Sequence, residues 1–573
     1  MKSLTRQGRE WEIAPSPNVT LVEEIRLSLG CAHPFAVLLA RRGGKTWQRL
    51  IQPDLCNLHS PFELRGMNEG ITRLVRAIEK NETVFIHGDF DVDGLSGAAV
   101  LYQGLLPLVP KGTIKVEVGD RHRGHGLSSE FVHRAIDENF SLIITADCGT
   151  SNVNEIALLN EAGIDTIITD HHLVSLPPPK ATALINPHRP GETYPNPHLA
   201  GVGVTYKLIC ALYEHLGHPP PHHLLDLVAL GTIADLVPLA ENGEIENYIM
   251  VREAFSLIAR GEGSSLGLRV LLERLSIDPK RITTSDIGYL IAPKLNAANR
   301  AGDPKVAFLL LTTAKLQRAE YLTEILLDYN RDREIAQGDL VSQAEEQLAE
   351  NRIDPEEDGV VILTGKYWNE GILGLVASHF ADRYRVPTVI ISQGDHTSRA
   401  SCRSVAGFDI MACLEAHADL LLHYGGHHMA AGFSVANEYL PELRKRLLNY
   451  VAHQGPTCPR LATASIDSEI TSGEIDVRFY NDIRSLAPYG PGNPAPLFLL
   501  RNCSLEEIAL VGTQQQHLKG KVVQDGLSLP FIAFRMGRYS DLFETVENAA
   551  LVFRAGFDDW RRSVQLEIVD LVE

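Results

Sequence analysis

Aspartate and histidine residues gather at the ends of three short apolar runs that resemble β-strands. The three ends are Asp170-His171-His172 after Ile167–Thr169, His87–Gly94 after Thr83–Ile86, and Asp147-Cys148 after Leu142–Ala146. One such end alone is usually a polar turn or a helix N-cap. In an open parallel sheet, however, the carboxyl ends of neighbouring strands converge on one crevice. Three acidic ends there predict a metal site.

The segment Asp89–Gly94 has aspartates at alternate positions, like the start of a calcium-binding loop. A calcium loop needs a glutamate at its twelfth position, which is Val100 here, and a helix before it, where the pattern predicts a strand. We therefore exclude that motif. We expect His87, Asp91 and Asp93 to be metal ligands on one tight loop.

Further carboxylates complete the expected site. Asp147 has two oxygens to share between two ions, and Asp89 is either a ligand or a partner of one. Asp235, after the apolar run 229–234, can reach the same crevice, with Asp226 as the competing candidate. Carboxylates mixed with imidazoles suit Mn²⁺ or Mg²⁺. Two such ions about 3.5–4 Å apart would activate water for phosphoryl displacement.

Composition limits the class of protein. A chain of 573 residues predicts about three or four domains. The polar N-terminus and the lack of about 18 consecutive apolar residues predict a cytoplasmic protein with no membrane partner. Eight cysteines without a C-x-x-C pair favour a reducing compartment.

The net charge of −19 argues against broad electrostatic binding of nucleic acid. It does not exclude a nucleic-acid enzyme, because bound divalent ions make a carboxylate-rich site much less negative.

The elements that must position these residues follow a βαβ rhythm from about 80 to 235, which predicts a parallel α/β sheet. Helices are expected at 94–106, 154–162 and 204–216. A charged stretch at 313–351, with no proline, predicts one long helix or two surface helices.

A second α/β unit is expected to follow, and the tail from about 460 predicts a small β-barrel or sandwich. The predicted domains are a little-patterned extension at 1–55, a first α/β domain at 56–312, a connecting helix at 313–352, a second α/β domain at 353–455 and a barrel at 456–573.

The order of these motifs resembles the DHH phosphoesterases. Their four motifs match His87-x-x-x-Asp91-x-Asp93, Asp147, Asp170-His171-His172 and Asp235. The segments 185–190, 199–204, 229–239, 293–298 and 425–427 resemble the branch that degrades single-stranded DNA. The resemblance covers most of residues 50 to 500 in the expected order.

The resemblance implies a fold, a site and a reaction. The fold is a parallel-sheet DHH domain and an α/β DHH-associated domain, joined by a long helix, with an oligonucleotide-binding (OB) barrel. Two Mn²⁺ or Mg²⁺ ions would be held by His87, Asp91, Asp93, Asp147, His171, His172 and Asp235. Catalysis would rest on Asp91, Asp93, Asp147 and His171, while Asp89 and Asp170 orient ligands. The reaction would be 5′→3′ hydrolysis of single-stranded DNA to 5′-mononucleotides, in recombination and repair.

Two segments of the second α/β unit suit phosphate binding, although each also suits an ordinary turn. The glycine-rich segment Tyr424–Gly432 places a histidine beside an expected helix start. The segment Ser398–Ser404 carries two guanidiniums and several hydroxyls. Substrate contacts implied by the resemblance are Asn296, Arg300, Ser401, Arg403, Gly425, Gly426 and His427.

Aromatic residues of the tail, Phe553, Phe557 and Trp560, lie close in sequence to arginines and offer base-stacking surfaces. The alternative is that they are core residues, which we favour for Phe553.

Five positions depart from the family pattern: Cys148, Lys294, Asn299, His379 and Cys402. The lysine loses the bidentate phosphate geometry of arginine. A thiol nucleophile at Cys148 or Cys402 is a minor alternative.

Two other functions remain open. A phosphodiesterase for short oligonucleotides or cyclic dinucleotides would not need the barrel and the long linker. A non-catalytic replication scaffold would have lost metal ligands, whereas every expected position is filled. The partners implied by the resemblance are single-stranded DNA, a single-stranded-DNA-binding protein and a helicase.

Overall fold

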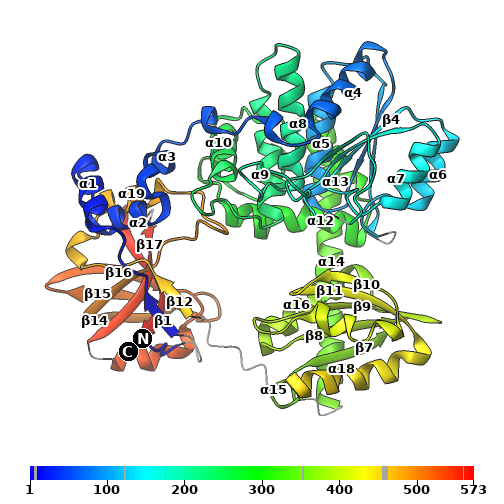
Figure 1. The fold of residues 1–573 in the computed structure, drawn as a ribbon. Helices are drawn as coiled ribbons and strands as arrows, with labels where there is room; N and C mark the ends of the chain where they lie inside the picture. Colours follow the sequence, from blue (N-terminus) through cyan, green and yellow to red (C-terminus); the bar gives the residue numbers. More distant parts are fainter. Residues whose placement is uncertain are drawn as a thin grey trace.

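The computed structural model describes residues 1–5, 10–121, 124–174, 176–350, 354–454, 463–546, 548–558 and 560–572. The long helix α14 (Leu316–Glu350) joins two α/β bodies, and a β-barrel lies to one side of them, beside the N-terminal helices (Figure 1). None of the described helices is long and apolar enough to cross a membrane.

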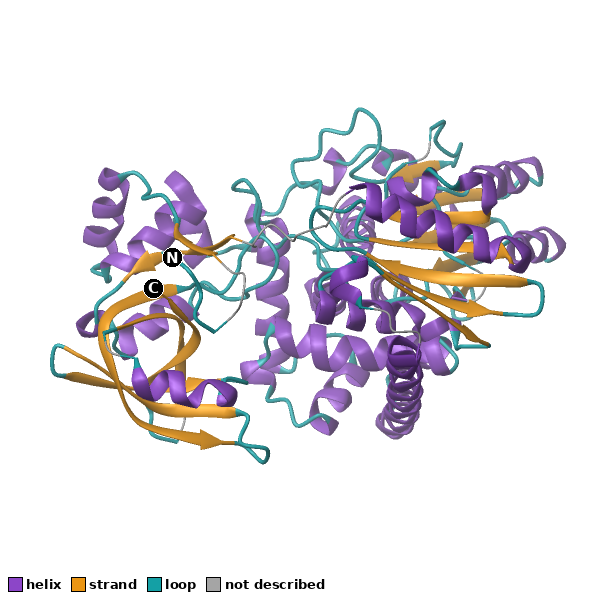
Figure 2. Ribbon diagram, turned by 90° about the horizontal axis from the view of Figure 1, so that it is seen from below, coloured by secondary structure: helices purple, strands orange, loops and turns teal. Residues whose placement is uncertain are grey.

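The first body contains a five-stranded sheet in the order β3-β2-β4-β5-β6, and every pairing is parallel, as predicted. Its strands are β2 (Val84–Gly88), β3 (Ile114–Val118), β4 (Leu142–Ala146), β5 (Asp165–Thr169) and β6 (Ala183–Ile185). Helices cover both faces of the sheet (Figure 2), so the strands read as continuous apolar runs.

Alternate strand residues face opposite layers. Val84 and Ile86 belong to the core shared with α4 (Met67–Glu79), α5 (Val92–Leu105) and α8 (Gly201–His215). Phe85 packs instead with residues of α6 (Ser129–Asp137) and α7 (Val153–Glu161). The helices expected at 94–106, 154–162 and 204–216 are therefore present as α5, α7 and α8, each beginning within three residues of its predicted start.

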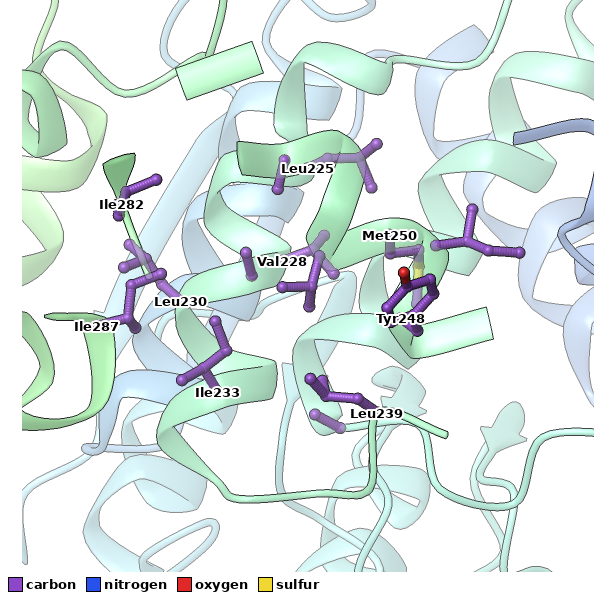
Figure 3. Packing of buried hydrophobic residues seen from close by; sticks show 14 of the residues in the cluster. Leu225, Val228, Leu230, Ile233, Leu239, Tyr248, Met250, Ile282 and Ile287 are labelled. Carbon is purple, nitrogen blue, oxygen red and sulfur yellow. The ribbon is translucent and has the colours of Figure 1, made fainter. Parts of the chain in front are cut away.

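Helix α9 (Leu225–Ala234) is predominantly apolar and buried from Leu225 to Ile233, as expected of a helix through the middle of a core. Figure 3 shows Leu225, Val228, Leu230 and Ile233 packed among side chains of neighbouring segments. The short helix α3 (Gln48–Ile51) follows α2 (His33–Gly43), and this body also contains α10 (Glu246–Arg260), α11 (Leu266–Arg274), a π-helix (Asp286–Ile291), α12 (Ala292–Ala301) and α13 (Lys305–Thr312). Asp235 directly follows α9, so the buried helix fixes its position.

The long helix is continuous: α14 runs from Leu316 to Glu350, so the alternative of two surface helices is wrong. The second body has a mixed sheet in the order β10-β11-β9-β8-β7. Its strands are β7 (Val361–Lys366), β8 (Thr388–Gln393), β9 (Thr397–Arg403), β10 (Leu421–His427) and β11 (Ala430–Ala436), and its helices are α15 (Pro355–Asp358), α16 (Leu373–Tyr384), α17 (Ile410–Glu415) and α18 (Leu440–Gln454).

The helix start expected within Tyr424–Gly432 is wrong, because β10 and β11 form an antiparallel hairpin there. The glycines suit the hairpin: Gly426 has φ +141°, which a side chain rarely adopts.

The C-terminal body is the expected barrel. Strands β14 (Phe498–Val511), β15 (His517–Gln524), β16 (Leu527–Ala533), β18 (Ser563–Val572) and β17 (Ala549–Asp558) pair in that order, and β17 returns to β14. The short elements α19 (Val477–Arg484), α20 (Ser540–Thr545), β12 (Thr463–Ile466) and β13 (Ser468–Glu469) complete it. Phe553 is a fully buried core residue, whereas Trp560 is 89% exposed.

The N-terminal residues belong structurally to this barrel. Strand β1 (Glu10–Ile13) pairs in parallel with β12, and the helices α1 (Val19–Leu29) and α2 (His33–Gly43) share the large core with barrel residues. Trp11 Nε1 donates a hydrogen bond of 2.7 Å to the buried Asp570 carboxylate. The two chain ends therefore lie side by side (Figures 1 and 2). Sequence pattern did not reveal this partnership.

Candidate metal centre and phosphate cradle

The loop after β2 brings three aspartates into one turn. Asp91 caps helix α5, because its Oδ1 accepts hydrogen bonds from the backbone N–H groups of Asp93 (3.0 Å) and Gly94 (3.1 Å). A Cβ at Gly94 would lie 2.5 Å from the backbone nitrogen of Asp89, so only glycine allows this close turn.

Asp93 belongs to helix α5, and its side chain reaches the N-terminus of helix α8, where unpaired N–H groups favour an anion. Its carboxylate accepts hydrogen bonds from the backbone N–H of Gly201 (2.7 Å) and of Val202 (2.9 Å). A Cβ at Gly201 would collide with the carboxylate of Asp147. Because Gly201 has no side chain, the carboxylates of Asp93 and Asp147 can both lie at the N-terminus of α8.

Asp170 supports the two histidines that follow it. Its carboxylate accepts hydrogen bonds from the backbone N–H groups of Thr150, His171 and His172, and Oδ1 lies 2.8 Å from His172 Nδ1. Although burial opposes ionisation, these contacts hold the pKa of Asp170 below its ordinary range. Burial likewise opposes the charge on His172, but the bond to Asp170 raises the pKa of His172 to about 9.

His171 points at three carboxylates. Its Nε2 lies 3.3 Å from Asp147 Oδ1, 3.5 Å from Asp235 Oδ2 and 3.8 Å from Asp93 Oδ2. Burial, together with the neighbouring charge of His172, lowers the pKa of His171 to about 4. The imidazole is therefore neutral near pH 7, and its buried Nε2 has no hydrogen-bond partner. A neutral nitrogen facing carboxylates is suited to bind a cation.

The described residues contain three groups whose ligand atoms all lie within 4.8 Å of one another. The groups are Asp147-His171-His172, Asp93-His171-Asp235 and Asp89-Asp91-Asp147. Because Asp147 and His171 each belong to two groups, the arrangement suits two neighbouring ions.

Electrostatics support a cation here. Burial and the neighbouring carboxylates raise the pKa of Asp91 to about 6 and that of Asp235 to about 8. Burial alone dominates the rise of the pKa of Asp93 to about 6. The buried Asp147 Oδ1 has no hydrogen-bond donor. Oxygen and imidazole ligands with surplus negative charge fit Mn²⁺ or Mg²⁺.

The structure thus brings together six of the seven expected ligands: Asp91, Asp93, Asp147, His171, His172 and Asp235. His87 lies apart from the three groups found among the described residues. It is 3% exposed, with its ring 4.6 Å from that of Phe131. Asp89, expected to orient a ligand, is itself in one group.

Asp226 faces elsewhere. Its carboxylate is satisfied by the backbone N–H of Leu227 and Ser265 and by the hydroxyl of Ser264. Asp235, rather than Asp226, is therefore the carboxylate that reaches the crevice.

A cluster of guanidiniums faces the carboxylates. Arg300 on α12 and Arg403 on β9 were expected; Arg121, after β3, and Arg333, on α14, were not. Burial and the positive charges of Arg121, Arg333 and Arg403 lower the pKa of Arg300 to about 9. The negative charge of Asp91 has the opposite effect and raises the pKa of both Arg300 and Arg121. Such a cluster suits phosphate oxygens, which accept bidentate hydrogen bonds.

Both bodies hold this cluster in place. Arg300 donates a 2.8 Å hydrogen bond to the carbonyl of Gly371, which precedes α16. Arg403 donates to the hydroxyl of Ser378 (3.2 Å) and lies 3.3 Å from the hydroxyl of Ser401. The expected pair Ser401 and Arg403 therefore lies together.

The missed Arg121 stacks on the ring of Phe90 at 4.5 Å and donates to Asn299, which in turn donates to the carbonyl of Phe90. It follows the end of a strand of the same sheet, so the rule that revealed the aspartates could have found it. Arg333 lies within a long charged helix and has no such signal.

The remaining expected substrate contacts are less constrained. Asn296 Oδ1 accepts a hydrogen bond from Asn299 Nδ2 at 3.4 Å. Gly425, Gly426 and His427 lie on the exposed edge strand β10, and their contact with substrate stays a prediction.

A thiol nucleophile is disfavoured. Cys148 and Cys402 are completely buried. Burial raises the pKa of Cys148 well above its ordinary value and that of Cys402 to about 12, so both remain protonated.

Three family models match the chain: the DHH family N-terminal domain over residues 83–232, the DHHA1 domain over 357–453 and the RecJ OB domain over 466–570. The single-stranded-DNA-specific exonuclease RecJ of Bacillus subtilis is 30% identical, with 98% of this chain and 70% of the relative covered. That of Haemophilus influenzae is 31% identical, covering 94% of this chain and 96% of the relative.

Solved structures agree. RecJ from Thermus thermophilus in complex with Mn²⁺ is similar with a TM-score of 0.84 and 28% identity, over 99% of this chain and 80% of the other. The same protein in complex with Mg²⁺ has a TM-score of 0.77 and 26% identity, over 99% and 79% of the two chains. The family models, the sequence identities and the structural similarity all agree, and this chain belongs to the RecJ family.

Proposed function

We propose that this protein is a metal-dependent exonuclease that hydrolyses single-stranded DNA in the 5′→3′ direction and releases 5′-mononucleotides. The observation that carries the proposal is the set of three overlapping ligand groups, linked through Asp147 and His171, beside a guanidinium cluster. Curated relatives named as single-stranded-DNA-specific exonucleases support the choice of substrate.

Each part of the site has a distinct task in this reaction. Asp89, Asp91, Asp93, Asp147, His171, His172 and Asp235 would hold two Mn²⁺ or Mg²⁺ ions. Such ions supply an activated water and stabilise the leaving oxygen. Asp170 keeps the ring of His172 oriented through the Nδ1 bond, which leaves Nε2 available.

The guanidiniums would position the strand. Arg121, Arg300 and Arg403 would hold a phosphate in line with the carboxylate groups, because a fork of N–H donors fixes both the place and the orientation of phosphate oxygens. The barrel, with the exposed Trp560 on its surface, would hold nucleotides further along the strand.

The biological setting is also a proposal. An enzyme restricted to single strands needs a helicase to open duplex ends, and meets DNA coated by single-stranded-DNA-binding protein. These two partners, a role in recombination and repair, a cytoplasmic location and the domain limits 56–312, 353–455 and 456–573 stay predictions.

Digestion of end-labelled DNA tests the function directly. Single-stranded DNA labelled at the 5′ end should release labelled mononucleotide at once in Mn²⁺ or Mg²⁺, whereas a 3′ label should appear last and blunt duplex should resist. Early release of the 3′ label would contradict the polarity. Cleavage confined to dinucleotides would indicate the short-oligonucleotide phosphodiesterase instead.

A further inference from the structure

His125 contacts two of the metal-binding side chains, although no motif identified from the sequence includes it. Its Nδ1 lies 3.1 Å from Asp89 Oδ1. Its ring also meets the ring of His172 edge-on, with 4.6 Å between centroids. The His125 side chain is 35% exposed, while that of Asp89 is 3% exposed. His125 therefore lies at the mouth of the crevice and covers a buried carboxylate.

The backbone holds His125 in this place. It stands between Gly124 (φ +91°) and Gly126 (φ +89°), conformations that other residues rarely adopt. A Cβ at Gly126 would collide with the side-chain oxygen of Asn152. The Asn152 amide accepts a hydrogen bond from the N–H of Leu127 and donates one to its carbonyl. Since Asn152 lies in the loop after β4, the loop that carries Asp147 also anchors the segment carrying His125.

We infer that His125 is a positioning residue for the metal centre. The imidazole nitrogen, 3.1 Å from Asp89 Oδ1, stands against one oxygen of a carboxylate that is otherwise without a hydrogen-bond partner at that atom, and so holds its rotamer and leaves the other oxygen for a cation shared with Asp91 and Asp147. The entropy of ordering Asp89 is then lost on folding rather than on metal binding. This inference rests on the metal centre of the proposed function.

Direct ligation by His125 is not what the geometry indicates. Within the described ranges, none of the three groups with mutually close ligand atoms includes it. Its influence acts through Asp89, and removal of a group that orients a metal ligand typically lowers metal affinity by about 10- to 100-fold.

Two substitutions separate the polar contact with Asp89 from ring packing against His172. His125→Phe keeps a ring against His172 but removes the donor, whereas His125→Asn keeps an N–H donor near the position of Nδ1 and removes the ring. His133→Ala, at an exposed histidine of the nearby helix α6, is the matched control. Mn²⁺ affinity is measured by calorimetry on the full chain without DNA, with thermal melting of the metal-free proteins as the check of folding.

We expect His125→Phe to weaken Mn²⁺ binding by about 10- to 100-fold. His125→Asn and His133→Ala should bind within a few-fold of the wild type. With saturating Mn²⁺, the kcat of His125→Phe should return toward that of the wild type, since a high metal concentration fills the weakened site by mass action.

Three results would overturn the inference: wild-type affinity in His125→Phe, equal weakening in the Phe and Asn variants, or a loss of affinity that merely follows a lowered melting temperature. Absence of Mn²⁺ binding by the wild type would instead refute the metal centre itself, and the inference with it. The two failures are therefore distinguishable.

Discussion

The centre depends on a few residues that allow unusually close approach. Asp147 has a positive φ of 63°, a conformation that aspartate tolerates better than most residues, and this directs its carboxylate toward His171. Gly201 leaves the space that this carboxylate occupies. The position of one bridging ligand is thus set by backbone geometry as well as by residue type.

Gly201→Ala should abolish most Mn²⁺-dependent turnover, because the new methyl group would displace Asp147. The matched control is Gly203→Ala in the same helix, where a Cβ would lie 3.3 Å from the flexible side chain of Leu199. Turnover on labelled single-stranded DNA and Mn²⁺ affinity are the measurements. Equal activity of the two variants would show that Asp147 does not need its observed position.

Asp91→Asn should remove hydrolysis while leaving the fold intact, since asparagine also caps a helix. Loss of a metal ligand should lower activity by more than the roughly 10- to 100-fold that is typical when a residue that orients a ligand is removed. The metal-free variant should melt no lower than the wild type, because burial and the charges of Asp89 and Asp93 disfavour ionised Asp91. It should also gain less thermal stability from added Mn²⁺. Near-wild-type turnover would refute the ligand role.

At this scale, residue type and spacing predicted the site well wherever a ligand ends a strand. Asp91, Asp147 and the pair His171 and His172 all follow strands, and the structure brings them together. His87 lies outside the three groups, within β2 itself and with its ring 4.6 Å from that of Phe131, and its role as a ligand stays a prediction.

Elements from different parts of the chain build the phosphate cradle. Arg121 follows β3, Arg300 lies on α12, Arg333 on α14 and Arg403 on β9. Since α14 links the two α/β bodies, it sets the separation between the carboxylates of the first body and Arg403 of the second. Periodicity could predict a long helix, but not which of its charges faces the crevice, because that depends on how the second body packs.

Arg403→Ala should raise the KM for single-stranded DNA by about 10-fold or more, the usual cost of losing a hydrogen bond to a charged group. Its effect on kcat at saturating substrate should be smaller. The control is Arg385→Asn, at the C-terminal end of helix α16. Asparagine tolerates the positive φ of 56° that Arg385 adopts there. Unchanged kinetics on 5′-phosphorylated DNA would remove Arg403 from the cradle.

The largest apolar core joins two of the three bodies, which sequence patterns did not reveal. Buried residues of the catalytic body, of α1 and α2, and of the barrel belong to a single apolar cluster. A truncation near residue 460 would therefore uncover apolar surface of the N-terminal helices as well as removing the barrel. Long-range pairing of this kind leaves no local signal, which is why residues 1–55 lacked a recognisable pattern.

A surface substitution is consequently the better test of the barrel. Trp560→Ser should weaken binding of long single strands by roughly 10-fold, as expected when one base loses an aromatic stacking partner. Cleavage of a dinucleotide and the melting temperature should not change, since Trp560 is 89% exposed. Tyr439→Ser, at a 46% exposed aromatic of the second α/β body, is the control. Equal effects on long and short substrates would exclude a stacking role.

The contact between the N-terminal strand β1 and the C-terminal strand β18 also sets an order of events during synthesis. Trp11 and its partner Asp570 are 559 residues apart. At the usual rate of translation, they emerge from the ribosome on the order of half a minute to two minutes apart. The catalytic sheet, whose strands lie between residues 84 and 185, is complete in the nascent chain long before then. The barrel closes last, around a segment that was among the first to be made.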